Sequence, residues 1–191
     1  MTSNSLSRWL AAGQRALDEI ENAHLRIGGP LRGRRYATLQ INYAYTTLLS
    51  SNFQKFCRDL HSEAVDHITG AIPPALQGFL RTEMVSNRAL DRGNPHPGAV
   101  GSDFNRLGVD LWTEVYALDQ RNPRRRKLLQ ELVDWRNAVA HQDFDPVAGS
   151  RSPRLHLSKV REWRRAVRAL AQSFDRVMYN YLTNLLGSPP W

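Results

Sequence analysis

The chain has 191 residues and a mass of 21.8 kDa, a size that fits one compact domain. Its hydrophobic share of 41% and charged share of 23% are typical of a globular protein and argue against a disordered or fibrous chain. The formal net charge of +8 favours polyanions, such as nucleic acid or anionic lipid, as partners. All but three of the 26 Lys and Arg residues are arginines, a bias that a GC-rich coding sequence also produces.

Cys57 is the only cysteine, so the chain has no intrachain disulfide framework and no zinc site built mainly from thiolates. A lone cysteine suits a reducing compartment. The first 20 residues carry charges throughout and contain no apolar run like that of a signal peptide, and no later uncharged stretch is apolar enough to span a bilayer. These features predict a cytoplasmic protein without a membrane partner.

Apolar residues recur at three- and four-residue steps along the first third of the chain, which is typical of amphipathic helices. The pattern predicts a first helix from Leu6 to Ile27, ended by the glycines that follow. A second helix is predicted over about 35–69, because one apolar stripe continues until Gly70. Two prolines then open a third helix that we expect to end near Asp91.

Residues 92–102 hold three glycines and two prolines, so we expect a mobile loop there. A fourth helix is predicted over 104–118. Asn122 followed by Pro123 resembles a helix cap and a first helical residue, which predicts a fifth helix that ends between residues 141 and 146. A second mobile loop is expected near 145–154.

The last apolar stripe runs from Val160 to Leu185 and predicts a C-terminal helix of roughly 30 residues. No segment shows the alternation of a strand. We therefore expect an all-α, antiparallel bundle of four to six helices in a single domain, residues 1–191. Three tryptophans on apolar stripes should lie in the core: Trp9, Trp112 and Trp163. Four arginines opposite the last stripe are most simply a solvated face, with RNA or an acidic partner as the alternative: Arg161, Arg164, Arg165 and Arg168.

Arg136 breaks the pattern of the fifth helix. It follows Leu132 by four residues and Val133 by three, so it shares the stripe that faces the bundle, where an unpaired guanidinium is costly. One interpretation pairs Arg136 with Asp134 or with a carboxylate of another helix. The other combines Arg136 with Asn137 and His141, two residues four apart on one helical face. A two-fold dimer that joins two such helix ends would surround one cleft with two arginines and two histidines.

The segment LVDWRNAVAH, residues 132–141, resembles the signature of the HEPN superfamily, in which an arginine is followed by a polar residue and four to six residues separate that arginine from a histidine. Four residues intervene here. Related families carry an acidic residue near the middle of their second helix, whereas this chain has Gln54 at that place. The resemblance implies a metal-independent endoribonuclease, acting as a toxin or an antiviral defence effector, with its active site between the protomers of a homodimer and no cofactor.

The chemistry of these residues agrees with RNA cleavage. His141 is a candidate general base for a ribose 2′-OH, and a histidine is also available to protonate the leaving oxygen. Arg136 is the candidate for stabilising the charge of the transition state, because its fork of donors matches phosphate geometry. Asn137 is expected to orient His141 or to bind RNA.

Candidate RNA contacts besides the catalytic candidates are Arg124, Arg125, Arg126, Lys127 and Trp135. The four cations lie at a helix N-terminus, where a solvated basic turn is the alternative, and Trp135 is more simply explained as core. The spacing of His141, Asp143 and Asp145 also allows a metal site, although a solvated turn explains it more simply. The alternative functions are a non-catalytic HEPN-type module that binds RNA, nucleotide or protein, and a basic helical antitoxin or scaffold. A nucleotidyltransferase-like antitoxin is an expected partner if the protein is a toxin.

Overall fold

The computed structural model describes residues 1–28, 35–148 and 154–191. These ranges are helical apart from turns and contain no strand, which confirms the predicted all-α bundle with a long C-terminal helix. No helix among the described residues is long and apolar enough to cross a membrane. In chain order the elements are α1 (Asn4–Arg8), the π-helical turn η1 (Trp9–Gly13), α2 (Gln14–Gly28), α3 (Arg35–Gly70), α4 (Pro74–Val85), α5 (Ala89–Arg92), α6 (Pro97–Asn105), α7 (Leu111–Leu118), α8 (Asn122–His141), α9 (Asp145–Ala148) and α10 (Leu157–Leu186).

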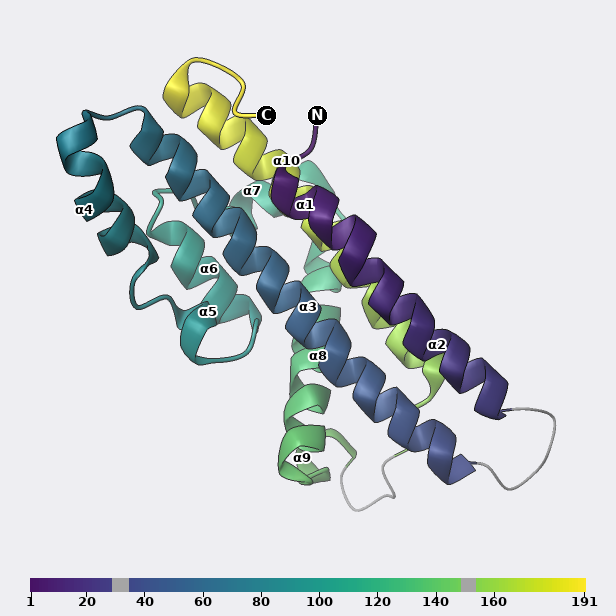
Figure 1. The fold of residues 1–191 in the computed structure, drawn as a ribbon. Helices are drawn as coiled ribbons and strands as arrows, with labels where there is room; N and C mark the ends of the chain where they lie inside the picture. The colour runs from purple at the N-terminus through teal and green to yellow at the C-terminus, as the bar shows by residue number, and fades with distance from the viewer. Residues whose placement is uncertain (29–34, 149–153) are drawn as a thin grey trace.

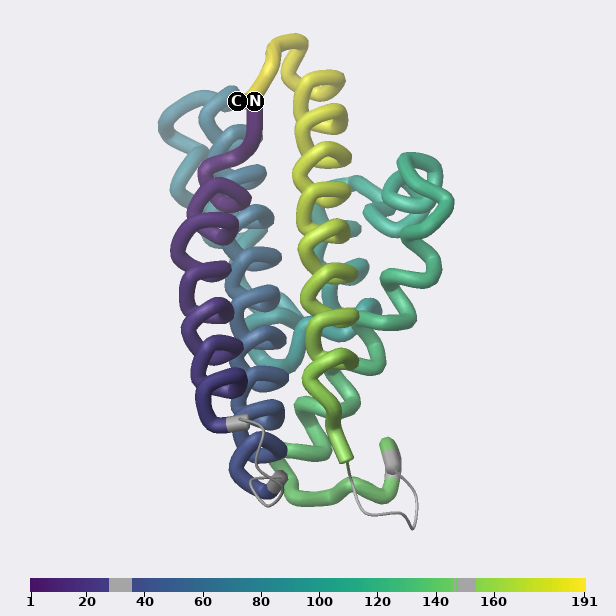
Figure 2. The backbone as a smooth tube through the Cα atoms, turned by 90° about the vertical axis from the view of Figure 1, so that its right-hand side faces the viewer, coloured from purple at the N-terminus to yellow at the C-terminus, as the bar shows by residue number. Residues whose placement is uncertain are grey.

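Helix α3 is the centre of the bundle (Figures 1 and 2). It packs against α2, α4, α8 and α10, and α10 packs in turn against α8 and α7. Both chain termini lie at the same end of the molecule, whereas α8 runs toward the opposite end and finishes beside α9 (Figure 1). The end of α8 is therefore remote from the termini.

The two longest helices follow from uninterrupted apolar stripes. Helix α3 spans 36 residues, about 54 Å at the usual rise, because no glycine or proline interrupts it before Gly70. Helix α10 spans 30 residues, in agreement with the predicted length. Each contributes fully buried aromatic side chains to the core, including Phe53 of α3 and Phe174 of α10. Trp9, Trp112 and Trp163 are buried as predicted.

The N-terminal helix was predicted as regular α-helix, whereas the structure contains one π-helical turn within it. Helices α1 and α2 continue into one another through the π-turn Trp9–Gly13, which a regular 3.6-residue pattern does not reveal. A β-carbon at Gly13 would lie 3.0 Å from Cδ1 of Trp9, so the glycine leaves room for the buried indole. The widened turn thus accommodates Trp9 in the core.

The predicted helix over 73–91 was wrong at its C-terminal end. Helix α4 stops at Val85, and Asn87 has a left-handed backbone with φ of 57°. The chain then forms α5, whose first two N–H groups, those of Ala89 and Leu90, donate to the carboxylate of Asp103. This contact is long-range in the fold, so local periodicity does not show where the helix breaks.

The predictions over 92–118 also need correction. Part of the expected loop over 92–102 is helix α6, which begins at Pro97 because Nδ1 of His96 accepts the N–H groups of Gly98 and Ala99. The expected helix over 104–118 is divided between α6 and α7. Gly108, with φ of 85°, turns the chain between them, and Asp110 caps α7.

Helix α8 agrees with the fifth predicted helix in both length and position. Asn122, however, is its first residue rather than its cap, and its buried Nδ2 donates to the carbonyl of Val115. Part of the expected loop near 145–154 forms the short helix α9, and residues 149–153 of that prediction lie outside the described residues.

The arginine face of α10 is only partly solvated. Arg165 and Arg168 are exposed as expected. Arg161 and Arg164 instead form ion pairs with carboxylates of α2, and the Arg164 side chain is only 16% exposed. The expectation of a wholly solvated face was therefore wrong, because α2 packs beside α10 and covers part of it.

Candidate functional site

The last two turns of α8 carry the three predicted catalytic residues, Arg136, Asn137 and His141. The helix ends because Gln142 adopts a left-handed backbone, with φ of 56°. The N–H groups of Gln142 and Asp143 both donate to the carbonyl of Ala138, which closes the helix end.

Arg136 is half-buried, and the partner of its guanidinium is a neutral amide. Its Nη1 donates to Oδ1 of Asn137 over 3.3 Å, and Nδ2 of Asn94 donates to the same oxygen. Among the described residues no carboxylate forms an ion pair with Arg136, and Asp134 instead accepts from Gln130. The structure therefore does not contain the predicted pairing of Arg136 with Asp134, and Asn137 contacts the arginine rather than His141.

The turn between α5 and α6 brings Asn94 to this site. Nε2 of Gln54 on α3 donates to the carbonyls of Leu90 and Gly93, in each case over 2.6 Å. These bonds hold the turn in place one residue before Asn94. Asn94 was missed by the sequence analysis, because nothing in its spacing links residue 94 to residue 137.

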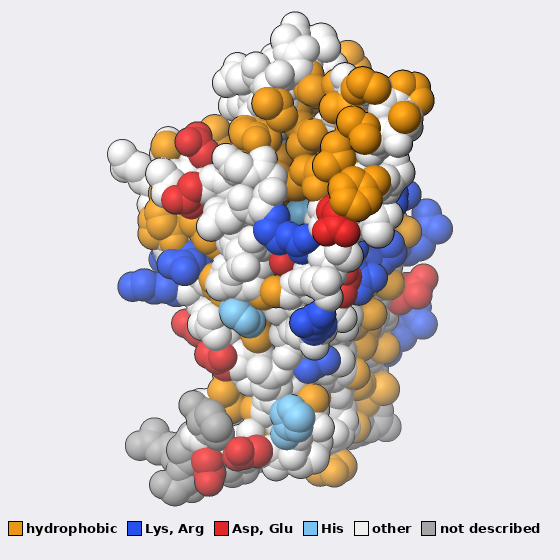
Figure 3. Space-filling model, turned by 90° about the vertical axis from the view of Figure 1, so that its left-hand side faces the viewer, with side chains coloured by type: hydrophobic (Ala, Val, Ile, Leu, Met, Phe, Trp, Pro, Cys, Tyr) orange, Lys and Arg blue, Asp and Glu red, His pale blue; other side chains and the backbone are white. Residues whose placement is uncertain are grey.

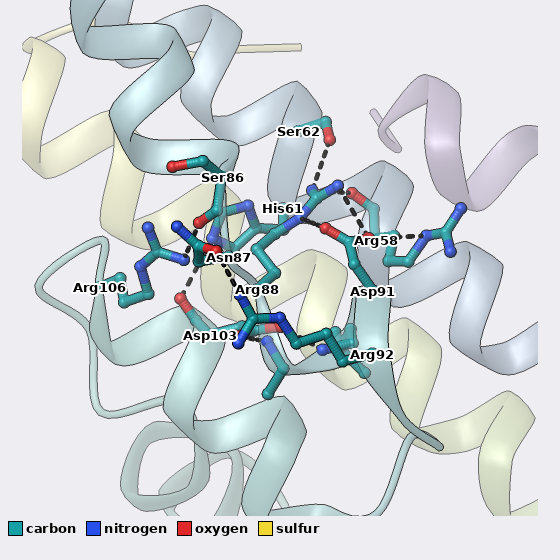
Figure 4. A network of polar contacts seen from close by, with 12 residues as sticks. Arg58, His61, Ser62, Ser86, Asn87, Arg88, Asp91, Arg92, Asp103 and Arg106 are labelled. Atoms are coloured by element: carbon teal, nitrogen blue, oxygen red, sulfur yellow. Dashed lines mark hydrogen bonds and ion pairs between the residues drawn. The ribbon is translucent and has the colours of Figure 1, made fainter.

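A buried polar pair, His61 and Asp103, supports α5, the helix that comes just before this turn. Asp103 is 1% exposed, and His61, fully buried on α3, contacts its backbone carbonyl through Nε2 at 3.1 Å. Burial, together with the nearby positive charge of Arg88, lowers the pKa of His61 to about 4. Figure 4 shows His61 and Asp103 within one network of polar side chains.

His141 is exposed in the final turn of α8. Five helical positions separate it from Arg136, which corresponds to about 140° around the helix axis. One protomer therefore presents the two side chains on different sides of the same helix end. The convergence of Arg136 and His141 across a dimer interface stays a prediction.

The four cations at the start of α8 lie nine or more residues before Arg136, which is about 14 Å or more along the helix. Arg125 is mostly buried and pairs with Asp119 over 2.7 Å. Arg124 is exposed and pairs with Glu162, and Arg126 lies 5.2 Å from the ring centre of Trp112. Lys127 is exposed. The structure does not bring these residues together with the catalytic candidates.

Trp135 lies next to Arg136 but is half-buried between other aromatic rings. Its ring centre is 6.3 Å from that of Trp163 and 6.4 Å from that of Phe144. Phe144 in turn stacks on Tyr43 of α3 at 5.3 Å. These contacts give Trp135 a packing role at the end of α8.

Metal-ligating side chains do not gather at this site. Within the described ranges, no three His, Cys, Asp or Glu residues are grouped so that they could hold a metal ion, and this includes His141, Asp143 and Asp145.

Comparisons with protein-family models, with curated proteins and with solved structures found no match to this chain.

Proposed function

We propose that the protein is a metal-independent endoribonuclease of HEPN type that works as a homodimer. Arg136 and His141 of two protomers act on one RNA linkage. In this proposal the protein is a cytoplasmic toxin or antiviral defence effector, restrained by a partner such as a nucleotidyltransferase-like antitoxin.

The observation that carries the proposal is the half-buried guanidinium of Arg136, which no carboxylate of the described residues neutralises. A partly buried cation without a counter-charge is less favourable than a paired one, and an anionic ligand supplies the missing counter-charge. The contacts of Asn137 and Asn94 hold the side chain in place without reducing its charge. Such an arrangement suits a phosphodiester.

The reaction follows from ordinary acid–base chemistry. His141 takes the proton from the 2′-OH, the oxygen attacks the adjacent phosphorus, and the 5′-oxygen leaves with a proton from a histidine, producing a 2′,3′-cyclic phosphate. Arg136 stabilises the charge on the phosphorane. Asn137 acts as a positioning residue for Arg136, because its oxygen accepts from the guanidinium.

A second candidate function, a non-catalytic HEPN-type binding module, is favoured by Gln54. Its amide donates to two carbonyls of the α5–α6 turn, so the position where related families carry an acid is used here to hold the backbone. RNA binding without cleavage is the expected behaviour of such a module.

Cleavage of labelled single-stranded RNA by the purified protein, with and without EDTA, tests the proposal. We expect cleavage in EDTA and a loss of about 10²–10³-fold in Arg136→Ala and His141→Ala. Arg15→Ala, an exposed arginine on α2, is the matched control and should retain full activity. Unchanged cleavage in both site variants overturns the mechanism, whereas RNA binding without cleavage favours the binding module.

A further inference from the structure

An open cleft of about 460 Å³ lies beside the candidate site, between the end of α4, α5 and α6. Its lining residues are Asn87, Ala89, Arg92, Gly93, Ser102, Asp103 and Arg106. Figure 3 shows the corresponding face of the molecule, where Lys and Arg side chains gather below the apolar surface. Phe79 of α4 is an exposed large hydrophobic side chain. The candidate site and the cleft are separate, but Gly93 lines the cleft and its neighbour Asn94 contacts Asn137.

The two arginines of the cleft are held by neutral groups. Arg106 donates from Nη1 to the carbonyl of Ser86 and from Nη2 to that of Glu83, each over 2.7 Å. Arg92 donates to the side-chain oxygen of Asn87. Neither arginine forms an ion pair with a carboxylate of the described residues, so both guanidinium groups are oriented while their charge stays uncompensated.

The other arginines nearby are used differently. Arg58 and Arg88 both pair with Asp91, and Arg88 also donates to Oγ of Ser62 (Figure 4). Their charge is at least partly neutralised within the protein. The free positive charge of this region therefore belongs to Arg92 and Arg106.

Asp103 is the carboxylate among the lining residues given above. Its negative charge is not aimed at an anion in the cleft, because both of its oxygens accept backbone N–H groups. One oxygen accepts the N–H of Ala89 over 2.8 Å and the other accepts that of Leu90 over 2.9 Å. The residue is 1% exposed. Its charge is therefore directed at backbone donors, while the exposed Ser102 adds a hydroxyl at the rim of the cleft.

We propose that this cleft binds a phosphate of an RNA strand, next to the phosphate that reacts at Arg136. Paired guanidinium groups from two elements match the several oxygens of a phosphate, which accept hydrogen bonds from their forked donors. Gly93 lines the cleft, and the next residue, Asn94, contacts Asn137 of the candidate site, so the two places are connected through one residue. The inference rests on the proposed function for the identity of the strand, and its test is independent of cleavage.

The experiment measures binding of a fully 2′-O-methylated single-stranded RNA decamer by fluorescence anisotropy over a range of salt concentrations. The variants are Arg92→Gln, Arg106→Gln and the double variant, with Arg15→Gln as the matched control. The double variant should bind about tenfold more weakly, and the salt slope of log Kd should be smaller by about 0.7, the value for one phosphate contact on a single strand. The control should match the wild type.

Arg106→Lys guards against a folding defect, because it keeps the charge when the bonds to the two carbonyls are lost. Its binding should lie between that of the wild type and Arg106→Gln, with circular dichroism unchanged. A second arm titrates inorganic phosphate while the side-chain Nε–H signals of Arg92 and Arg106 are followed by NMR, and saturable shifts are expected.

Unchanged RNA affinity and salt slope in the double variant overturn the inference, even if inorganic phosphate shifts the arginine signals, because the site then takes free phosphate only. The two proposals fail separately. If the wild type never cleaves RNA and the double variant binds RNA more weakly than the wild type, the nuclease proposal alone is refuted. If cleavage depends on Arg136 and the substitution of Arg92 and Arg106 leaves RNA binding unchanged, the cleft proposal alone is refuted.

Discussion

Arg164 on α10 and Arg136 on α8 are both arginines on helix faces that turn toward neighbouring helices, yet their surroundings are opposite. Arg164 donates to Asp18 over 2.6 Å and to the hydroxyl of Tyr45 over 3.0 Å, and it pairs with Glu21 over 3.4 Å. Among the described residues, the guanidinium of Arg136 donates to the amide oxygen of Asn137 and pairs with no carboxylate. One guanidinium is neutralised inside the fold, whereas the other has no carboxylate partner among the residues that the structure describes.

The difference shows how the two regions use polar groups. Near Arg164 the carboxylate of Glu21 on α2 is stabilised in its charged form. Burial raises the pKa of Glu21, but hydrogen bonds from Tyr45 and Arg161 outweigh this effect and leave that pKa lowered. This network joins α2, α3 and α10 and serves stability. At the α5–α6 turn and the end of α8, polar groups are oriented without being neutralised, which is typical of binding sites.

The largest effect on stability is expected at Arg164. Arg164→Met leaves the acids of α2 without their shared cation and should lower the free energy of unfolding by about 3 kcal/mol. Arg136→Met should change it by less than about 0.5 kcal/mol, because no ion pair is lost. Urea denaturation followed by circular dichroism measures both, and equal losses would contradict the comparison.

The pH dependence of stability should reveal His61. Because its pKa is about 4 in the folded chain and about 6.5 when unfolded, the unfolded chain takes up the proton first. The contribution of His61 is fully present above pH 6.5 and is lost as the pH falls toward 4, by up to about 3 kcal/mol. The free energies of unfolding of the wild type and His61→Gln, measured between pH 4 and 7, should approach each other as the pH falls. A constant difference across this range refutes the role of His61.

Removal of the group that orients Arg136 should have a moderate effect on cleavage. Asn137→Ala should lower kcat about tenfold with little change in KM, because the guanidinium is then less well placed in the transition state. Asn94→Ala should act in the same direction, and the exposed Asn22 on α2 provides the control Asn22→Ala. A change in KM alone would assign Asn137 to RNA binding.

An effect smaller than that of Arg164→Met is expected at Tyr45. Its hydroxyl donates to Glu21 over 2.8 Å and accepts from Arg164, while the ring is fully buried. Tyr45→Phe keeps the ring and removes both hydrogen bonds, so the free energy of unfolding should fall by about 1 kcal/mol. A loss as large as that of Arg164→Met would mean that the hydroxyl, rather than the cation, organises the network.

Much of the fold was predictable because long helices record their buried face in the sequence. The stripes of α3, α8 and α10 have a regular period over many turns, and their positions were correct. The segment from Ser86 to Asp110 was not predictable in the same way. Its short helices are set by caps such as His96 and by Asp103, whose partners at α5 lie 13 and 14 residues earlier in the chain.

Residue order was enough to predict the all-α class, the long helices and the location of Arg136, Asn137 and His141 on the last turns of one helix. Periodicity and spacing are local properties that can be recognised without knowing the neighbouring helices. Three-dimensional packing sets which arginines are neutralised, brings Gln54 and Asn94 to support the end of α8, and joins Arg92 and Arg106 in one cleft. The free energy of a charge depends on what surrounds it in space, and those neighbours come from distant parts of the chain.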